Sequence, residues 1–386
     1  MPLQNHIFMQ SQNAPLSHAE RIDRVRLIRT ENVGPVTFMR LLERFGTATA
    51  ALTALPELAK RGGRTAPLRI PGKTEVEREA AALERMSARW LFRGEAEYPG
   101  PLAALDDAPP VLTLLGFPAL LSRPCVGIVG ARNASIVGRK MAEKLGRDLA
   151  EAGFTVVSGL ARGIDTSAHH GALAGGVSGG GTVAVVAGGV DIIYPPENDG
   201  LYRDIAARGA VLAESPLGTE PQARHFPRRN RLISGLSLGI VVVEAAVKSG
   251  SLITARFAGE QGRDVFAVPG SPLDPRAQGC NRLIKEGAGL VENADDIISH
   301  LRGALHRPLS EPSGGLFRPT TPAQEDEVEL EKARRRVVEC LSPSPVLIDE
   351  VVRGCQLSAG VVLTVLLELE LAGRLQRHPG GQVSLI

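Results

Sequence analysis

The sequence predicts a doubly wound α/β domain placed between a small all-α module and a C-terminal winged-helix module. From residue 125 to about 268, short β-branched runs alternate with helical segments, which is typical of a parallel sheet with crossover helices. Several of these runs are continuous in Val, Ile and Ala, as expected for strands buried on both faces. The length of 386 residues is enough for two or three domains.

In the N-terminal part of the chain, the sequence predicts a loose tail followed by a helical module. Residues 1–20 are polar and aperiodic, so we expect a tail there. Over 21–88 apolar residues recur at helical spacing, most clearly at Phe38, Leu41 and Phe45 before Gly46. Prolines then interrupt the chain up to residue 124, and a single strand is predicted at 111–115.

The predicted α/β domain covers 89–305. Its helix over 135–152 has Ser135 as a candidate N-cap and Gly153 as a left-handed stop. Its strands are predicted at 125–129, 154–157, 182–187, 210–213, 240–243 and 264–268.

The C-terminal part predicts a linker and a winged helix. Residues 306–326 are rich in Pro, Ser and Gly, so we expect a flexible linker there. Over 327–386 the pattern predicts three helices and then a hairpin around residues 379–381. The helices are expected at 328–341, 346–353 and 358–371.

Composition and charge exclude several classes of protein. With 44 Lys and Arg against 42 Asp and Glu the net charge is +2, so any site for a polyanion must be a local patch. The four cysteines form no Cys-x-x-Cys pair, and we expect no metal and no cofactor. The sequence has no run of 18 apolar residues and no secretory signal pattern, which predicts a cytoplasmic protein without a membrane partner.

The residues that follow the predicted strands indicate a phosphate ligand. In an open parallel sheet, ligands bind at the carboxyl ends of the strands. Gly130, Arg132 and Asn133 follow the first of these strands, and Ser158-Gly159 with Arg162 follow the second. Glycine lets a ligand approach backbone N–H groups, and helix N-termini favour anions. The alternative is that these glycines only permit close turns.

Two further segments add positive charge and hydroxyl groups. Residues 224–231 hold four arginines, no acid and one aromatic residue, and we expect them to form the loop before a helix that starts near Arg231. Lys248, Ser249 and Ser251 follow the strand at 240–243 and open a helix. Both segments suit successive phosphates, although an arginine cluster can also be a solvated surface.

Five ordered motifs resemble the DNA-processing protein A (DprA/Smf) family. They are GIVGAR at 127–132, SGLARGID at 158–165, YPPEN at 194–198, FPRRNR at 226–231 and SGSLIT at 249–254. The resemblance implies an extended Rossmann-like domain that binds single-stranded DNA, forms a homodimer and helps load the recombinase RecA during natural transformation. It also implies a sterile-alpha-motif-like (SAM-like) N-terminal domain, a C-terminal winged helix and no catalytic turnover. The chain departs from the family pattern at Ala131, where Ser is common, and at Pro196, where many members have a basic residue.

The candidate DNA-binding residues come from two sources. The strand ends and the basic segment supply Gly130, Asn133, Arg162 and Arg228. The resemblance, position by position, implies Arg132, Ser158, Gly159, Phe226, Arg229, Asn230, Arg231, Lys248, Ser249 and Ser251.

These residues predict a groove in which arginines and helix N-termini hold phosphates and Phe226 offers a stacking surface. The third helix of the winged helix is very apolar, so docking of a partner is as good an expectation as reading of duplex DNA. The alternative function is a Rossmann-like nucleotide-processing enzyme of the phosphoribohydrolase kind, with Glu244 beside Ser249-Gly250-Ser251. The Pro-Gly-Gly-x-Gly-Thr motif of those enzymes is absent.

Overall fold

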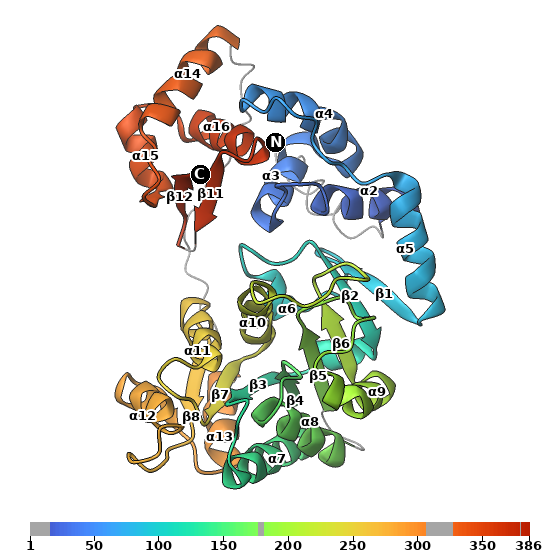
Figure 1. The fold of residues 1–386 in the computed structure, drawn as a ribbon, viewed down its shortest axis with the longest axis vertical. Helices are drawn as coiled ribbons and strands as arrows, with labels where there is room; N and C mark the ends of the chain where they lie inside the picture. Colours follow the sequence, from blue (N-terminus) through green and yellow to red (C-terminus); the bar gives the residue numbers. More distant parts are fainter. Residues whose placement is uncertain (1–15, 177–180, 306–326, 379) are drawn as a thin grey trace, which may run out of the picture. The chain divides into compact units, whose positions relative to one another are not determined.

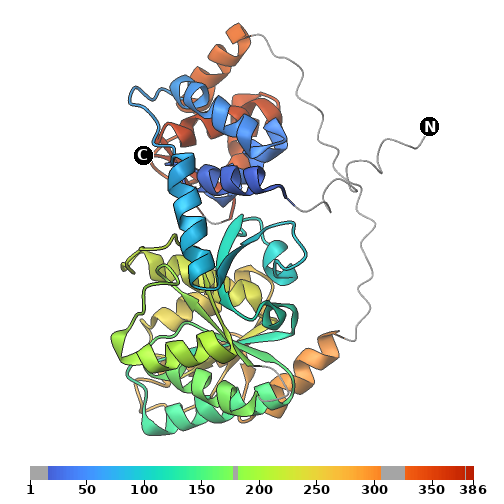
Figure 2. The same ribbon diagram turned by 90° about the vertical axis from the view of Figure 1, so that its right-hand side faces the viewer.

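A computed structural model describes residues 16–176, 181–305, 327–378 and 380–386. The described residues form two compact units, seen in Figures 1 and 2. The first unit holds 78–305, and the second combines 16–77 with the described part of 327–386. The predicted linker at 306–326 and most of the predicted tail lie outside the described residues.

The first unit is built on one nine-stranded sheet with the order β1-β2-β6-β5-β4-β3-β7-β8-β9. Pairing is parallel from β6 through to β9, whereas β1–β2 and β2–β6 pair antiparallel. The strands are β1 (Ala88–Phe92), β2 (Val111–Gly116), β3 (Cys125–Gly130), β4 (Thr155–Ser158), β5 (Gly181–Val186), β6 (Ala210–Ala213), β7 (Gly239–Val243), β8 (Asp264–Ala267) and β9 (Gly289–Leu290).

The predicted fold class is confirmed, and the seven predicted strands form within one or two residues of their expected ends. Strand β1 was not expected. It contains the exposed Arg89 and ends before a stretch broken by prolines, so it lacks the continuous apolar run of the central strands. It is held by its hairpin partner, with Phe92 opposite Val111 and Ala88 opposite Leu115.

Helices cover both faces of the sheet, and each face has its own apolar core. One core packs α7 (Ile136–Glu151), α8 (Ile164–Gly175) and α13 (Ala294–Leu305) on the sheet through residues such as Leu145 and Ile297. The other packs α6 (Gly100–Ala103), α10 (His225–Leu236), α11 (Gly250–Glu260) and α12 (Gln278–Lys285) through residues such as Leu232 and Ala255. The remaining elements of this unit are η2 (Pro118–Ser122), η3 (Pro196–Asn198) and α9 (Asp199–Arg208).

The strand order places a switch point between β3 and β7. The chain moves from β3 to β4 on one side and returns to β7 on the other. Loops that follow strands at such a point diverge and leave a crevice at the carboxyl edge of the sheet. The loops after β3 and β7 are two of the segments from which the sequence predicts a phosphate site.

The second unit joins helices from both ends of the chain. Its N-terminal helices are α2 (His18–Ile28), α3 (Pro35–Phe45) and α4 (Ala48–Arg61), and α5 (Lys73–Arg85) begins in it. Its C-terminal part has α14 (Glu327–Glu339), α15 (Ile348–Cys355), α16 (Ala359–Leu371) and a small sheet of β10 (Val346–Leu347), β11 (Leu375–His378) and β12 (Gln382–Leu385). Helix α2 begins at His18, inside the predicted tail of residues 1–20, with Ser17 as its N-cap.

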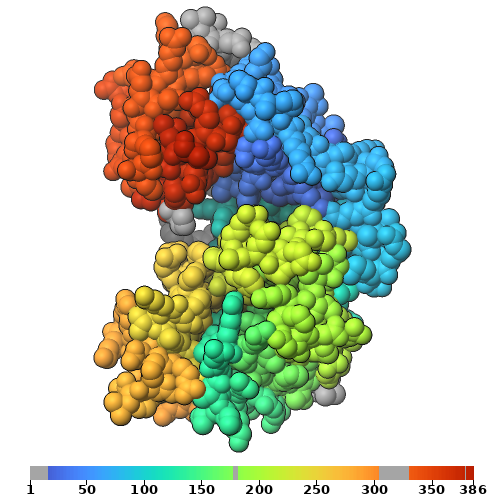
Figure 3. All heavy atoms as spheres, viewed as in Figure 1, coloured from blue at the N-terminus to red at the C-terminus, as the bar shows by residue number. Residues whose placement is uncertain are grey.

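Helix α16 belongs to two apolar cores at once. Val362 and Val365 pack inside the winged helix, whereas Leu367 and Leu371 join the core of α2, α3 and α4. The side-chain amide Nδ2 of Asn32 donates to the Leu371 carbonyl at 3.2 Å, and Arg374 Nη1 donates to the Gly62 carbonyl at 3.2 Å. Figure 3 shows the winged-helix surface in contact with that of the N-terminal helices. The third helix of the winged helix therefore packs against the N-terminal helices of the same chain.

In the described part of the chain, no individual helix is both long and apolar enough to cross a membrane. The pair α15 and α16 passes such a test only when the two are taken together, and they are bent by 117° at the break between them.

Candidate functional site

A groove lies at the carboxyl edge of the sheet, with a cavity volume of about 840 Å³. The loop after β3 supplies Gly130, Arg132 and Asn133 to its wall. The loop after β7 and the start of α11 supply Lys248, Ser249 and Ser251. Helix α10 lies between these two loops in the lining and supplies Phe226, Arg229 and Asn230. Nine of the fourteen candidate residues therefore line one groove.

Helix α10 determines which residues of the basic segment reach the groove. The segment was expected to be a loop, but the helix begins at His225, so that prediction is wrong. Pro227 is compatible with the helix because N–H groups of the first turn have no intrahelical partner. Residues spaced three and four apart share one face of a helix. The groove-lining face of α10 carries Phe226, Arg229, Asn230 and Ile233.

Arg229 is a buried cation at this groove. It is 6% exposed, and its Nη1 donates to the Val185 carbonyl at 2.7 Å. Its Nε–H has no hydrogen-bond partner among the described residues. The pKa of Arg229 is lowered to about 10, mainly by burial; the charge of Asp165 opposes this shift and the nearby charge of Arg132 adds to it. An anion that binds next to a buried guanidinium with an unpaired N–H would stabilise its positive charge.

Aromatic rings stand beside that cation. The rings of Tyr194 and Phe226 are 5.8 Å apart between centroids. The guanidinium carbons of Arg132 and Arg229 lie 5.2 Å and 5.9 Å from the centre of the Phe226 ring. These four side chains also line a smaller pocket of about 100 Å³, to which Gly159 and Arg162 contribute. Cationic and aromatic groups thus lie next to each other, as in sites that bind single strands.

The start of α11 offers hydroxyl and amide groups to the groove. Ser249 is the N-cap of α11, and its Oγ accepts a hydrogen bond from the Ser251 N–H at 3.3 Å. The two serine hydroxyls are 2.7 Å apart. Asn230 donates to the Gly250 carbonyl at 3.4 Å, which connects α10 to this helix start. A helix N-terminus with serine hydroxyls and the exposed Lys248 suits a phosphate group.

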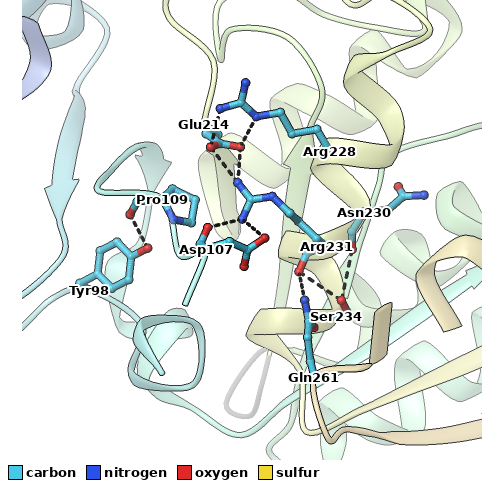
Figure 4. Close-up of polar contacts among 9 residues, drawn as sticks. All are labelled: Tyr98, Asp107, Pro109, Glu214, Arg228, Asn230, Arg231, Ser234 and Gln261. Atoms are coloured by element: carbon cyan, nitrogen blue, oxygen red, sulfur yellow. Dashed lines mark hydrogen bonds and ion pairs between the residues drawn. The ribbon is translucent and has the colours of Figure 1, made fainter. Parts of the chain in front are cut away.

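Arg228 and Arg231 lie on a different face of α10 and bind Glu214 (Figure 4). The Arg231 Nη2 lies 2.8 Å from both carboxylate oxygens of Glu214, and Arg228 Nη2 lies 2.8 Å from one of them. Arg231 also donates to the Asp107 carbonyl at 2.6 Å. Burial alone would raise the pKa of Glu214, but the two arginines outweigh it and lower that pKa. Neither arginine lines the groove or the smaller pocket.

The three candidates from the loop after β4 differ in burial and in their contacts. Ser158 is fully buried and donates to the Ile128 carbonyl at 2.6 Å, so its hydroxyl faces the sheet. Gly159 lines the small pocket, and its N–H donates to Asp165 at 3.1 Å. Arg162 lines the same pocket and forms an ion pair with Glu197.

The groove also contains residues that were not among the candidates. Arg276, from the loop after β8, lines the groove and pairs with Asp274 at 2.9 Å. Tyr194 lines both cavities. Tyr194 is the first residue of the YPPEN motif at 194–198, and this motif could have identified it from the sequence. The sequence offered no comparable signal for Arg276, because it follows a proline-containing loop far from the other cations.

Glu244, the candidate acid of the alternative function, is bound within the protein. Its carboxylate accepts hydrogen bonds from the N–H of Ser135 at 2.8 Å and from the Ser135 hydroxyl. It therefore connects the loop after β7 to the start of α7.

Three family descriptions match the chain in order. The one described as DNA recombination-mediator protein A matches residues 89–302, and the DprA-like N-terminal HHH domain matches 18–82. The DprA winged helix domain matches 321–381. The chain belongs to the DNA recombination-mediator protein A (DprA) family. The N-terminal helical domain, expected to be SAM-like, carries the HHH description in this family.

Similar DprA proteins cover most of the chain. The protein Smf of Synechocystis is 34% identical over 91% of this chain and 95% of its own length. The X-ray structure of DprA from Streptococcus pneumoniae has a TM-score of 0.61 at 35% identity and covers 74% of this chain and 98% of that one. DprA from Helicobacter pylori has a TM-score of 0.51 at 28% identity and covers 57% of this chain and 97% of that one. The latter structure is described as giving insight into a unique single-stranded DNA binding mode.

Proposed function

We propose that the protein binds single-stranded DNA and that the sugar-phosphate backbone of the strand lies in the groove at the carboxyl edge of the sheet. The observation that carries the proposal is that Arg132, Arg229 and Lys248 all line one groove. Serine hydroxyls and the α11 N-terminus lie in the same groove. Cationic residues that follow a strand backbone, together with an aromatic ring, are the usual means of binding single strands.

The depth of Arg229 supports a preference for single strands. It is 6% exposed, and its guanidinium carbon lies 5.9 Å from the centre of the Phe226 ring, so a phosphate must enter the groove to approach it. A flexible single strand can bend a phosphate into such a recess. A duplex is stiff over about 150 base pairs, and bending it costs free energy.

The contact set that we propose excludes three of the sequence candidates. It contains the groove residues Gly130, Arg132, Asn133, Phe226, Arg229, Asn230, Lys248, Ser249 and Ser251, and Gly159 and Arg162 in the small pocket. Ser158, Arg228 and Arg231 bind protein groups instead, and we assign them to the support of the site.

We further propose that the protein protects incoming DNA and assists loading of RecA on it during transformation and recombination. The family description as a recombination mediator supports this role. The direct test is RecA filament formation on single-stranded DNA coated with a single-strand-binding protein. The proposal expects faster filament formation when this protein is added, and an unchanged rate would overturn it.

We also propose that the protein is cytoplasmic, because RecA and incoming DNA meet inside the cell. We propose that it forms a homodimer, because the family resemblance implies one. Sedimentation equilibrium over a range of protein concentrations tests the dimer. A constant mass of one chain, 40.8 kDa, would reject it.

The primary experiment compares oligonucleotides of the same sequence as single strands and as duplexes. Fluorescence anisotropy is measured with the purified full chain while salt is varied. We expect tighter binding to the single strand and a log affinity that falls linearly with log salt. Equal affinity for both forms, or binding that does not respond to salt, would contradict the proposed site.

The alternative of a nucleotide-processing enzyme gains no support from the position of Glu244, because its carboxylate is bound to Ser135. The same preparation incubated with nucleoside monophosphates tests that alternative. Release of free base would favour the enzyme and would be absent under our proposal.

A further inference from the structure

Two cysteines meet in the winged helix at the ends of neighbouring helices. Cys340 directly follows α14, and Cys355 is the last residue of α15. They are 15 positions apart in sequence, and the connecting segment includes strand β10. Both thiols are free.

Three contacts place the two cysteines next to each other. The Cys355 thiol donates to the Arg336 carbonyl at 3.7 Å, and the Cys340 N–H donates to the same carbonyl at 3.2 Å. The Cys340 Sγ lies 3.9 Å from the position that a Cβ on Gly354 would occupy. Because residue 354 is glycine, no side chain stands between the Cys340 sulfur and the end of α15.

The two thiols differ in their access to solvent. Cys340 is exposed, whereas Cys355 is fully buried. Burial, and then the contact with Cys340, raises the pKa of Cys355 to about 12. An oxidant in solution therefore reaches Cys340 first, and the buried neighbour is in place to react with the oxidised sulfur.

We propose that Cys340 and Cys355 form a redox modification site, in which a hydroperoxide converts the pair to a reversible disulfide that links α14 to α15. This site belongs to the second unit, whereas the proposed groove belongs to the first.

The chemistry balances with hydrogen peroxide as the oxidant. The Cys340 thiolate attacks one peroxide oxygen and the O–O bond breaks, which gives a sulfenic acid and water. The Cys355 sulfur then attacks the Cys340 sulfur, the S–O bond breaks, and a second water leaves. Two thiols lose two electrons and two protons in total, and one peroxide becomes two waters. A dithiol reductant reverses the reaction.

The other two cysteines serve as internal controls. Cys125 is 2% exposed and its thiol lies 3.3 Å from the Arg123 carbonyl, while Cys280 is fully buried and lies 3.5 Å from the Val242 carbonyl. Burial raises the pKa of both thiols, to about 12 and about 11. We expect neither to react under conditions that oxidise the pair.

The test is mass spectrometry of the reduced full chain after titration with hydrogen peroxide and blocking of remaining thiols. We expect the intact protein to lose two hydrogens and a non-reducing digest to contain one peptide pair, joined through Cys340 and Cys355. Dithiothreitol should restore both thiols. In Cys340→Ser the disulfide should be absent, and in Cys355→Ser a sulfenic acid at Cys340 should be trapped by dimedone.

Two results would overturn the proposal. One is oxidation of Cys340 to sulfinic acid without any internal disulfide in the wild-type chain. The other is a disulfide that joins Cys340 of two separate copies. The wild-type digest decides between these outcomes even if a serine variant folds poorly. Binding of DNA is not part of the readout, so failure of this proposal leaves the proposed function untouched.

Discussion

Glu244, in the loop after β7, holds Ser135 at the start of α7 through two hydrogen bonds. Glu244 follows β7 with a φ of 53°, and its carboxylate accepts both the N–H and the hydroxyl of Ser135. The Ser135 Oγ in turn caps α7 by accepting the Gly138 N–H at 2.9 Å. A Cβ at Gly138 would lie 2.5 Å from the carboxyl carbon of Glu244, so any larger residue there would displace this carboxylate.

The first prediction concerns this link. Replacing Glu244 by Ala should destabilise the protein by about 1–3 kcal/mol, because the half-buried N–H and hydroxyl of Ser135 lose their acceptor. It should also weaken single-strand binding several-fold, since the loop with Arg132 loses its anchor. Urea unfolding and fluorescence anisotropy measure the two effects. Glu260→Ala, at an exposed pair with Arg256, is the control, and equal behaviour of both variants would disprove the role of the link.

The second prediction separates the two arginines that bind Glu214. Arg231→Ala leaves a buried carboxylate without its buried partner and should cost about 3–5 kcal/mol in the free energy of unfolding. Arg228→Ala removes a side chain that is 58% exposed, and we expect a loss of about 1 kcal/mol or less. Urea titrations of the two variants give the comparison. Similar losses in both would show that Arg231 does not support Glu214 as described.

The positions of these arginines illustrate what could and could not be predicted from the sequence. Continuous apolar runs located the central strands, and strand ends located the groove, because both depend on local pattern and on the topology of parallel sheets. The direction of each arginine depends on where α10 begins, and the proline at 227 concealed that start. A helix separates Arg228 and Arg231 from Arg229 by its period, which a loop would not do.

The sequence also could not predict that the two terminal domains pack against each other. The apolar third helix of the winged helix predicted docking of some partner, and that partner is the N-terminal helical domain. Two segments more than 300 residues apart pack together, and no local pattern encodes which surfaces meet. The glycine at 62 contributes by allowing α4 and α16 to approach closely.

The third prediction tests this docking. In Gly62→Ala the new Cβ would lie 2.0 Å from the Glu368 carbonyl oxygen of α16, although the φ of −71° suits alanine. We expect a destabilisation of about 1–3 kcal/mol from the steric conflict, and faster proteolysis of the winged helix. Gly72→Ala is the matched control, since nothing lies within 4 Å of its Cβ. A Gly62→Ala protein as stable as this control would contradict the docking.

The fourth prediction concerns pH. His169 is fully buried on α8, its Nδ1 lies 2.7 Å from the Thr182 hydroxyl, and burial lowers its pKa from 6.5 to about 3. Between these values the unfolded chain binds a proton that the folded protein does not, so acidification destabilises the fold. This residue should contribute a slope of about 1.4 kcal/mol per pH unit below pH 6.5.

The measurement is urea unfolding at several pH values between 7 and 4. His169→Gln should show a shallower loss of stability with falling pH than the wild type, whatever its stability at pH 7. Gly72→Ala, which changes no titratable group, is the control and should retain the wild-type slope. Parallel pH profiles for wild type and His169→Gln would refute this explanation.

The central claim is that phosphates bind at Arg229 and not at Arg228, two neighbours on one helix, and salt dependence tests it most directly. The slope of log affinity against log salt for a single-stranded oligonucleotide should lose about 0.7 in magnitude in Arg229→Ala, the share of one phosphate contact. Arg228→Ala should keep the wild-type slope, because its side chain binds Glu214. A reduced slope in Arg228→Ala together with a wild-type slope in Arg229→Ala would contradict the proposed groove.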